Sequence, residues 1–192
     1  MKRLTQSATL FLGLFLIGCG PIIGQMMRAA DGVKAFEVKH GTLEGLGRGE
    51  SALVLGPFAK TAEAFYIARG EDAVGFAEEF QRQGVLQATV HVESMGTAVD
   101  LEQVRGLTPE QLRDRYGLAE APARVVFGTI MKRKTVIAPT RGVVMIVAYH
   151  LEFFDPASKD STVLMVAVRD LAERCIPLAV EEIRRQLDAT RD

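Results

Sequence analysis

The second half of the chain contains three long apolar stretches that lie close together in the sequence. They span residues 123–132, 143–154 and 162–168, and a short polar turn at 155–160 joins the last two. Successive strands joined by short turns pair antiparallel as a meander. The stretch 143–154 is apolar on both sides as far as Ala148, which predicts a central strand. The fold is therefore expected to be built around a sheet.

The remainder of the chain adds three shorter strands. Apolar and polar residues alternate in 33–40 and in 87–93, which is typical of half-buried strands. A continuous apolar run in 51–58 predicts a third strand that ends at Pro57, because proline cannot donate to a sheet ladder. Residues 59–71 are expected to form a loop, with or without a short helical turn.

Three segments carry helical signals. Residues 72–84 begin with an aspartate cap and end at a glycine, and residues 108–117 begin with Thr108-Pro109, a favourable helix start. A closing helix over 169–187 presents an apolar stripe. The stripe consists of Leu171, Ala172, Cys175, Leu178, Ala179 and Ile183. The order β-β-α-β-α-β-β-β-α predicts the α+β class: a single mixed sheet of about five to six strands with helices packed on it.

The first twenty residues, MKRLTQSATLFLGLFLIGCG, have the pattern of a targeting segment. A basic start precedes an apolar run of about ten residues, which is too short to span a bilayer as a mature helix and fits a secretory signal peptide. The ending Leu16-Ile17-Gly18-Cys19 resembles the lipobox of bacterial lipoproteins. In that family the chain is cut before the cysteine, here between Gly18 and Cys19, and the Cys19 thiol carries a diacylglycerol. An uncleaved anchor helix and a plain signal peptide are the alternatives.

The lipobox resemblance divides the chain into three parts. Residues 1–18 would be the cleaved signal peptide, 19–32 the lipidated cysteine and a short tether, and 33–192 a single periplasmic α+β domain. The residue after the cysteine is Gly20, and lipoproteins of Gram-negative bacteria without an aspartate there are sent on to the outer membrane. The resemblance thus implies a lipid-anchored protein of the cell envelope, on the outer membrane facing the periplasm if the host is Gram-negative.

Charge and cysteine content narrow the choice of partners. Removal of Lys2 and Arg3 with the signal peptide changes the formal net charge of −1 to −3, and no basic block suggests nucleic acid. If Cys19 carries lipid, Cys175 is the other of only two cysteines and no internal disulfide is available. Its place on an apolar stripe predicts a small buried hydrophobe, and a reactive thiol or an intermolecular disulfide site is the alternative.

Several segments resemble the periplasmic α/β domain shared by the curli-secretion lipoprotein, the lipoprotein activators of penicillin-binding proteins and the amino-terminal domain of TolB. The similar segments are ALVLGPF at 52–58, ARVVFGTI at 123–130 and the strand ending at Asp155. The chain departs from that family in its extra loop at 60–71, in the missing glycine of the last hairpin turn, and in having no segments for membrane-spanning pore hairpins. The resemblance implies an envelope assembly or regulatory role without a pore.

Two sites in the sequence invite a chemical interpretation. His91 and Glu93 lie on one expected strand and His150 and Glu152 on another, so that each pair shares a face. If these strands are neighbours, the four side chains make a candidate site for zinc or another divalent metal, or for acid–base catalysis. The alternative is that half-exposed strands simply carry polar residues.

The cluster 65–67 (Phe-Tyr-Ile) is expected either in the core or in contact with a partner or membrane surface.

No standard catalytic motif is present in the sequence, and no cofactor is expected beyond the covalent lipid on Cys19. The first hypothesis is a non-enzymatic lipoprotein that binds another envelope protein, with assembly into a homo-oligomer left open. A metal-binding or hydrolytic lipoprotein that uses the two His-x-Glu pairs is the second hypothesis, and a small-ligand carrier is the third. Whether the two histidines meet is the feature that separates the second from the first.

Overall fold

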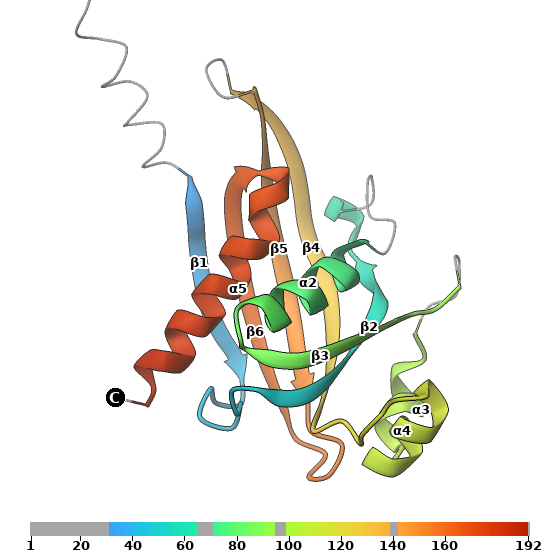
Figure 1. Ribbon diagram of the computed structural model, residues 1–192. Helices are drawn as coiled ribbons and strands as arrows, with labels where there is room; N and C mark the ends of the chain where they lie inside the picture. Colours follow the sequence, from blue (N-terminus) through green and yellow to red (C-terminus); the bar gives the residue numbers. More distant parts are fainter. Residues whose placement is uncertain (1–30, 65–70, 95–98, 139–141, 192) are drawn as a thin grey trace, which may run out of the picture.

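Six strands and four α-helices make up the described part of the chain (Figure 1). The computed structural model describes residues 31–64, 71–94, 99–138 and 142–191. The strands are β1 (Gly32–His40), β2 (Glu50–Lys60), β3 (Leu86–Val92), β4 (Arg124–Ala138), β5 (Gly142–Phe154) and β6 (Ser161–Leu171). The helices are α2 (Glu71–Arg82), α3 (Leu101–Gly106), α4 (Pro109–Tyr116) and α5 (Ala172–Ala189), with a 3-10 turn η1 (Ala62–Ala64) after β2.

The strands form one mixed sheet in the order β1-β6-β5-β4-β2-β3. β2 runs parallel to both β3 and β4, whereas the other neighbouring strands are antiparallel. The predicted meander of β4, β5 and β6 is confirmed, and β5 lies in the interior of the sheet between its two chain neighbours. The predicted α+β class with a single mixed sheet is therefore confirmed.

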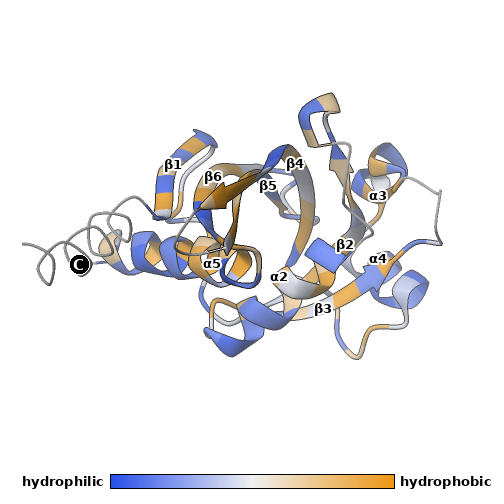
Figure 2. Cartoon of the chain, turned by 90° about the horizontal axis from the view of Figure 1, so that it is seen from above, coloured by the Kyte–Doolittle hydropathy of each residue, from blue (hydrophilic) through white to orange (hydrophobic). Residues whose placement is uncertain are grey.

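The first face of the sheet is covered by α2 and α5, which lie side by side along it (Figure 2). Side chains from β6 and β5 that point to this face are almost completely buried, as are the rings of Phe76 and Phe80 on α2. Tyr149 meets Phe76 edge-to-face, with ring centroids 4.9 Å apart. This cluster is the main hydrophobic core and supplies most of the buried apolar area that stabilises the fold.

Helix boundaries follow the local signals in the sequence. Thr108 accepts a bond from the Gln111 amide (3.3 Å), and the Gln111 side chain accepts one from the Thr108 amide (2.8 Å), so the expected start of α4 is confirmed as a capping box. Gly117 ends that helix with a φ of 63°, a conformation that glycine adopts without a steric penalty. α2 begins one residue before the predicted cap.

Three predicted boundaries are wrong, and the pairing partners explain why. β2 does not end at Pro57: β3 pairing stops at Gly56, and the register with β4 shifts between Leu55 and Ala59, so the proline interrupts no ladder. The closing helix begins at Ala172 rather than at 169, because residues 169–171 extend β6 along the end of β5. β4 likewise continues past 132 as far as Ala138, pairing with β5.

Two further segments differ from the sequence-based picture. The helix α3 was not predicted, although Asp100 caps it by accepting a bond from the Gln103 amide (3.0 Å). The predicted loop at 59–71 contains the end of β2 and the turn η1. The aromatic cluster Phe65-Tyr66-Ile67 lies outside the described residues. None of the helices in the described part of the chain is long and apolar enough to cross a membrane.

Candidate functional site

The second face of the sheet, opposite α2 and α5, is divided into two halves with different cover. Cross-strand pairing places one row of side chains on this face: His91 of β3, Leu55 of β2, Phe127 of β4 and Glu152 of β5. Near β2 the face is covered by α3 and α4. Towards β6 and β1, the side chains on this face belong to neither of the two hydrophobic clusters formed by the described residues.

The covered half is a small second core. Leu53 and Leu55 of β2 pack with Phe127 of β4 against Val104 of α3 and Leu112 of α4. All five side chains are buried. Since α3 and α4 are short, these contacts rather than intrinsic helix stability hold them in place.

A polar clamp borders the covered half. Arg105, in the last turn of α3, donates two bonds to the Glu152 carboxylate (2.9 and 2.7 Å), and Ser161 donates a third (2.6 Å). Lys159 donates to the backbone carbonyls of Arg105 (3.1 Å) and Leu107 (2.7 Å) at the end of the same helix. A cation at a helix C-terminus is favourable because the carbonyls there are otherwise unpaired. The clamp therefore fixes α3 to β5 and to the turn before β6.

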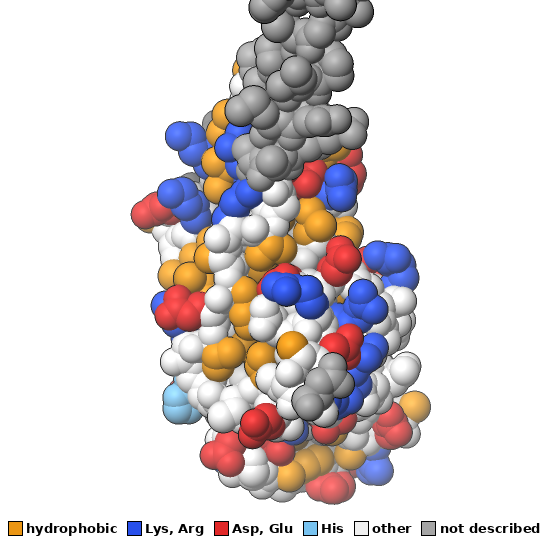
Figure 3. Space-filling view, turned by 90° about the vertical axis from the view of Figure 1, so that its left-hand side faces the viewer, with side chains coloured by type: hydrophobic (Ala, Val, Ile, Leu, Met, Phe, Trp, Pro, Cys, Tyr) orange, Lys and Arg blue, Asp and Glu red, His pale blue; other side chains and the backbone are white. Residues whose placement is uncertain are grey.

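The other half, which we call the open sheet face, consists of side chains of intermediate burial on β1, β5 and β6. Its members are Ala35, Ala148, His150, Met165 and Ala167. Their neighbours along β6, Leu164 and Val166, point to the first face and are fully buried. Figure 3 views the molecule from the β1 side, where hydrophobic side chains are exposed among charged ones. An apolar sheet surface of this kind is typical of a contact surface.

The structure does not bring the two His-x-Glu pairs together. β3 and β5 are separated by β4 and β2, so three strand spacings, about 14 Å, lie between His91 and Glu152 along their row. His91 lies 3.8 Å from Glu93, while Glu152 is bound by Arg105. No group of three or more metal-ligating side chains occurs among the described residues. The hypothesis required neighbouring strands, and the geometry gives that metal site no support.

His91 packs on an aromatic ring instead. Its imidazole meets Tyr116 of α4 with centroids 4.8 Å apart and the ring planes inclined at 63°. Burial raises the pKa of the Tyr116 hydroxyl, and the Glu93 carboxylate adds to this, while Arg115 opposes it. The contact holds α4 against the edge strand β3.

Cys175 is a free and fully buried thiol in the first turn of α5, as the sequence predicts. It donates to the Leu171 carbonyl (3.4 Å). Burial raises the pKa of the thiol to about 11. A reactive thiol needs exposure and a lowered pKa, so the alternative role is excluded by this environment.

A buried polar cluster joins α2 to the β4–β5 hairpin and was not predicted as a contact. The Asp72 carboxylate accepts bonds from Arg133 and from the Tyr149 hydroxyl (3.1 Å). Burial lowers the pKa of the Arg133 guanidinium, but the bond and attraction to Asp72 outweigh it and raise the pKa overall. Burial also raises the pKa of Tyr149, so that the hydroxyl stays protonated as a donor. The residue types signal only a helix cap and a basic strand, because the contact joins distant parts of the chain.

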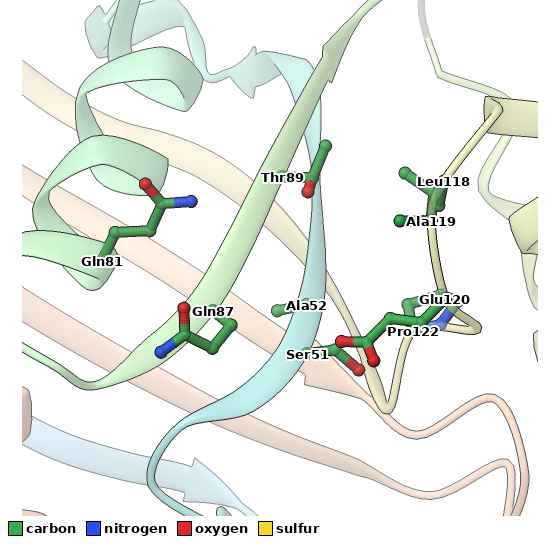
Figure 4. Close-up of a pocket in the computed structure, with 9 residues that line it drawn as sticks. All are labelled: Ser51, Ala52, Gln81, Gln87, Thr89, Leu118, Ala119, Glu120 and Pro122. Carbon is green, nitrogen blue, oxygen red and sulfur yellow. The ribbon is translucent and has the colours of Figure 1, made fainter.

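One pocket, of about 340 Å³, lies at the β3 edge between α2 and the loop after α4 (Figure 4). Its polar groups are already used in part: Gln81 Nε2 donates to the Ala88 carbonyl (2.5 Å), and Ser51 Oγ donates to the Ala121 carbonyl (3.2 Å). Glu120 is its only charged lining residue. Because Gln81 and Ser51 already bond within the fold, few polar lining groups remain to orient a ligand, and the pocket gives the small-ligand carrier hypothesis little geometric support.

Comparison with known proteins yields structural neighbours alone. No family model and no curated protein matches the chain. A PelC dodecamer from Paraburkholderia phytofirmans aligns with a TM-score of 0.49 at 14% identity, over 80% of this chain and 98% of that one. Lipoprotein GNA1162 from Neisseria meningitidis aligns with a TM-score of 0.40 at 12% identity, over 72% and 99%. The hypothetical protein CT253 from Chlamydia trachomatis gives 0.39 at 13%, over 74% and 96%. With identities this low and TM-scores below 0.5, these neighbours carry no argument about function.

Proposed function

We propose that the chain is a lipid-anchored envelope protein that works by binding another protein rather than by catalysis. The observation that carries this proposal is the open sheet face, an apolar surface on interior and edge strands that no described helix covers. The polar clusters on both faces of the sheet serve the fold, since Arg105 and Glu152 bind each other and Asp72 binds Arg133. No cofactor beyond the lipid on Cys19 and no nucleic-acid partner forms part of the proposal.

The composition of the open sheet face favours a protein as the occupant. Three of its five members are alanines, Ala35, Ala148 and Ala167, which allow close approach of a partner backbone. Met165 supplies an adaptable apolar side chain, and His150 a polar one that can be paired. Glu37 and Lys39 are exposed on the neighbouring edge strand and supply a polar rim. Both another envelope protein and a second copy of this chain satisfy these requirements.

The anchor explains where this contact takes place. Two or three acyl chains on Cys19 would make membrane attachment effectively stable. The thirteen residues 20–32 that follow Cys19 reach at most about 43 Å at roughly 3.3 Å per residue. The domain would therefore work close to its own membrane, which is the outer membrane, facing the periplasm, in a Gram-negative host. A Cys19→Ser variant is expected to leave the membrane fraction, and a variant that still sediments with membranes would contradict the anchor.

Photo-crosslinking in intact cells tests the proposed contact. A photoreactive amino acid replaces Met165 on the open sheet face, and the matched control replaces Glu181, an exposed residue of α5 on the other side of the sheet. The Met165 position is expected to give one dominant adduct that the control position lacks. Mass spectrometry of this adduct then distinguishes another envelope protein from a second copy of this chain. Equal, diffuse labelling from both positions would contradict the proposal.

A further inference from the structure

The far end of the β4–β5 hairpin exposes large apolar side chains, and lysines are exposed further along the same hairpin. Ile137 is 80% exposed, Val143 57% and Met131 40%, and the first two pair directly across the two strands. Lys132 and Lys134 are exposed on the same hairpin. We call these residues the hairpin patch: Met131, Lys132, Lys134, Ile137 and Val143. Such side chains on a folded domain are unfavourable in water unless another surface takes them up.

Apart from Glu152, the charged side chains of the β4–β5 hairpin are all basic. Between Arg124 and Glu152 the sequence contains no aspartate or glutamate, while it contains several basic residues. Arg133 is neutralised by the buried Asp72, so Lys132 and Lys134 present positive charge at the surface. Lys132 and Lys134 pair with Ala148 and Ile146, so by strand alternation they lie on the opposite side of the hairpin from Ile137 and Val143. A hairpin that meets a membrane end-on brings both the aliphatic groups and the positive charge to the lipid surface, which complements anionic headgroups over a hydrocarbon layer.

The hairpin patch lies at the end of the sheet where the N-terminal segment enters. Gly32, the first residue of β1, pairs with Arg169 of β6, which in turn pairs with Ile146 of β5. The hairpin continues for four residues beyond this row to Gly142, about 13 Å at roughly 3.3 Å per residue. The start of β1 and the hairpin both lie at the top of Figure 1. If Cys19 is held in a membrane, the chain from the anchor enters the domain at the end from which the hairpin projects.

The root of the hairpin is held firmly. The pairing between β4 and β5 runs from Val125 and Phe154 to Ala138 and Gly142 with a single irregularity. At its root, Arg133 and Tyr149 both bond to Asp72 at the start of α2. The hairpin therefore points in a defined direction relative to the core, rather than adapting to any surface that it meets.

From these observations we propose that the hairpin patch rests on the lipid surface of the membrane that holds the anchor. Ile137 and Val143 enter the headgroup region, and Lys132 and Lys134 face anionic headgroups. The hairpin does not cross the bilayer, because a spanning strand needs about 9–11 residues with an apolar outer side. This proposal rests on the lipid anchor of the proposed function. It adds a second contact that orients the domain and leaves the open sheet face accessible from the side.

The test uses the full lipidated protein in vesicles of phosphatidylglycerol and phosphatidylcholine. Ile137→Cys carries a fluorescent dye, and the acyl chains carry a nitroxide quencher. The matched control is Ala157→Cys, an exposed position in the turn before β6, at the opposite end of the sheet. Lipid on Cys19 and burial of Cys175 keep the native cysteines unlabelled. The dye at 137 is expected to be quenched at least threefold more than the dye at 157.

Flotation of the vesicles in the same experiment separates the two proposals. Protein that floats while both dyes are quenched equally would overturn the hairpin contact and leave the anchor intact. Protein that does not float would overturn both. A dye at 137 that is already shielded in detergent, before vesicles are added, would show a protein contact at the hairpin patch instead of lipid, and would also overturn the proposal.

A charge variant tests the role of the lysines without disturbing the core. In the dye-labelled protein, the double change Lys132→Gln and Lys134→Gln is expected to remove the extra quenching that phosphatidylglycerol produces over phosphatidylcholine alone. Both lysine side chains are exposed, so the fold is expected to be unaffected. Unchanged quenching in the double variant would show that the lysines do not contact the headgroups.

Discussion

The two halves of the second sheet face belong to the same sheet, but their side chains lie in different environments. Near β2, the row through Leu55 and Phe127 is sealed by α3 and α4. Near β6, Met165 and Ala167 lie on the same face and remain half-buried. The Arg105–Glu152 ion pair marks the border between the halves. Two short helices thus complete the core on one side, and no helix of the described residues covers the other side.

This difference indicates that one part of the molecule provides the stability of the fold and another part provides the surface for binding. The first face and the covered half hold the large buried side chains, including Tyr149, Leu53 and Leu112. The open sheet face is built largely from small residues whose removal leaves little unfilled volume. Substitutions in the first face or the covered half are therefore expected to lower the stability of the fold more than binding. Substitutions on the open sheet face are expected to lower binding more than stability.

The largest effect is expected in the covered half. Leu55→Ala removes a fully buried side chain between β2 and α4, and cavity formation is expected to lower the free energy of unfolding by about 2–5 kcal/mol. Urea denaturation measures this as a lower midpoint with an unchanged slope. A loss similar to that of the Met165→Ala variant described below would mean that the halves do not differ in packing.

A smaller effect is expected at the border. Glu152→Gln keeps the shape of the side chain and removes the charge that binds Arg105, with an expected loss of about 1 kcal/mol because Arg105 is partly exposed and solvent screens the pair. The difference between variant and native protein is expected to shrink in 1 M salt. A loss that is independent of salt would assign the effect to packing rather than to charge.

A still smaller effect is expected on the open sheet face. Met165→Ala removes a half-exposed side chain, and the expected loss of unfolding free energy is about 0.5 kcal/mol. Crosslinking to the partner from a neighbouring position of this face is nevertheless expected to fall severalfold. A large stability loss with unchanged crosslinking would reverse the roles that we assign to the two halves.

The thiol of Cys175 provides a test of burial on the first face of the sheet. Because burial raises the pKa to about 11, above the value of about 8.5 for an unfolded chain, the neutral thiol stabilises the fold below pH 8.5. That contribution is lost as the pH rises towards 11. Labelling with a thiol reagent at pH 8 is expected only after unfolding, and rapid labelling of the folded protein would contradict the burial.

Much of the fold could be predicted because it rests on local patterns. The α4 capping box, the helix α2 and the meander of β4, β5 and β6 all follow from spacing within single segments. The wrong boundaries depend on pairing partners distant in the sequence. Residues 169–171, for example, have a helix-compatible composition, yet β5 offers them a continuous ladder, and tertiary pairing overrides local preference.

The candidate site was harder to predict for the same reason. The alternation in β3 and β5 places the histidine and the glutamate of each pair on one face, but only the strand order reveals that β4 and β2 separate the two pairs. Equally, Arg105 and Glu152 are 47 residues apart, so their contact has no local signal. A surface such as the open sheet face becomes visible only once the positions of all the helices are known.

The central claim, that the open sheet face is occupied in the native envelope, can be measured through the thiol reactivity of Ala167→Cys. Its labelling rate is compared in intact membranes and in the purified, detergent-extracted protein, with Glu181→Cys on α5 as the matched control. We expect labelling at position 167 to be at least tenfold slower in the membranes, with no change at position 181. Equal rates at position 167 in both preparations would contradict the claim.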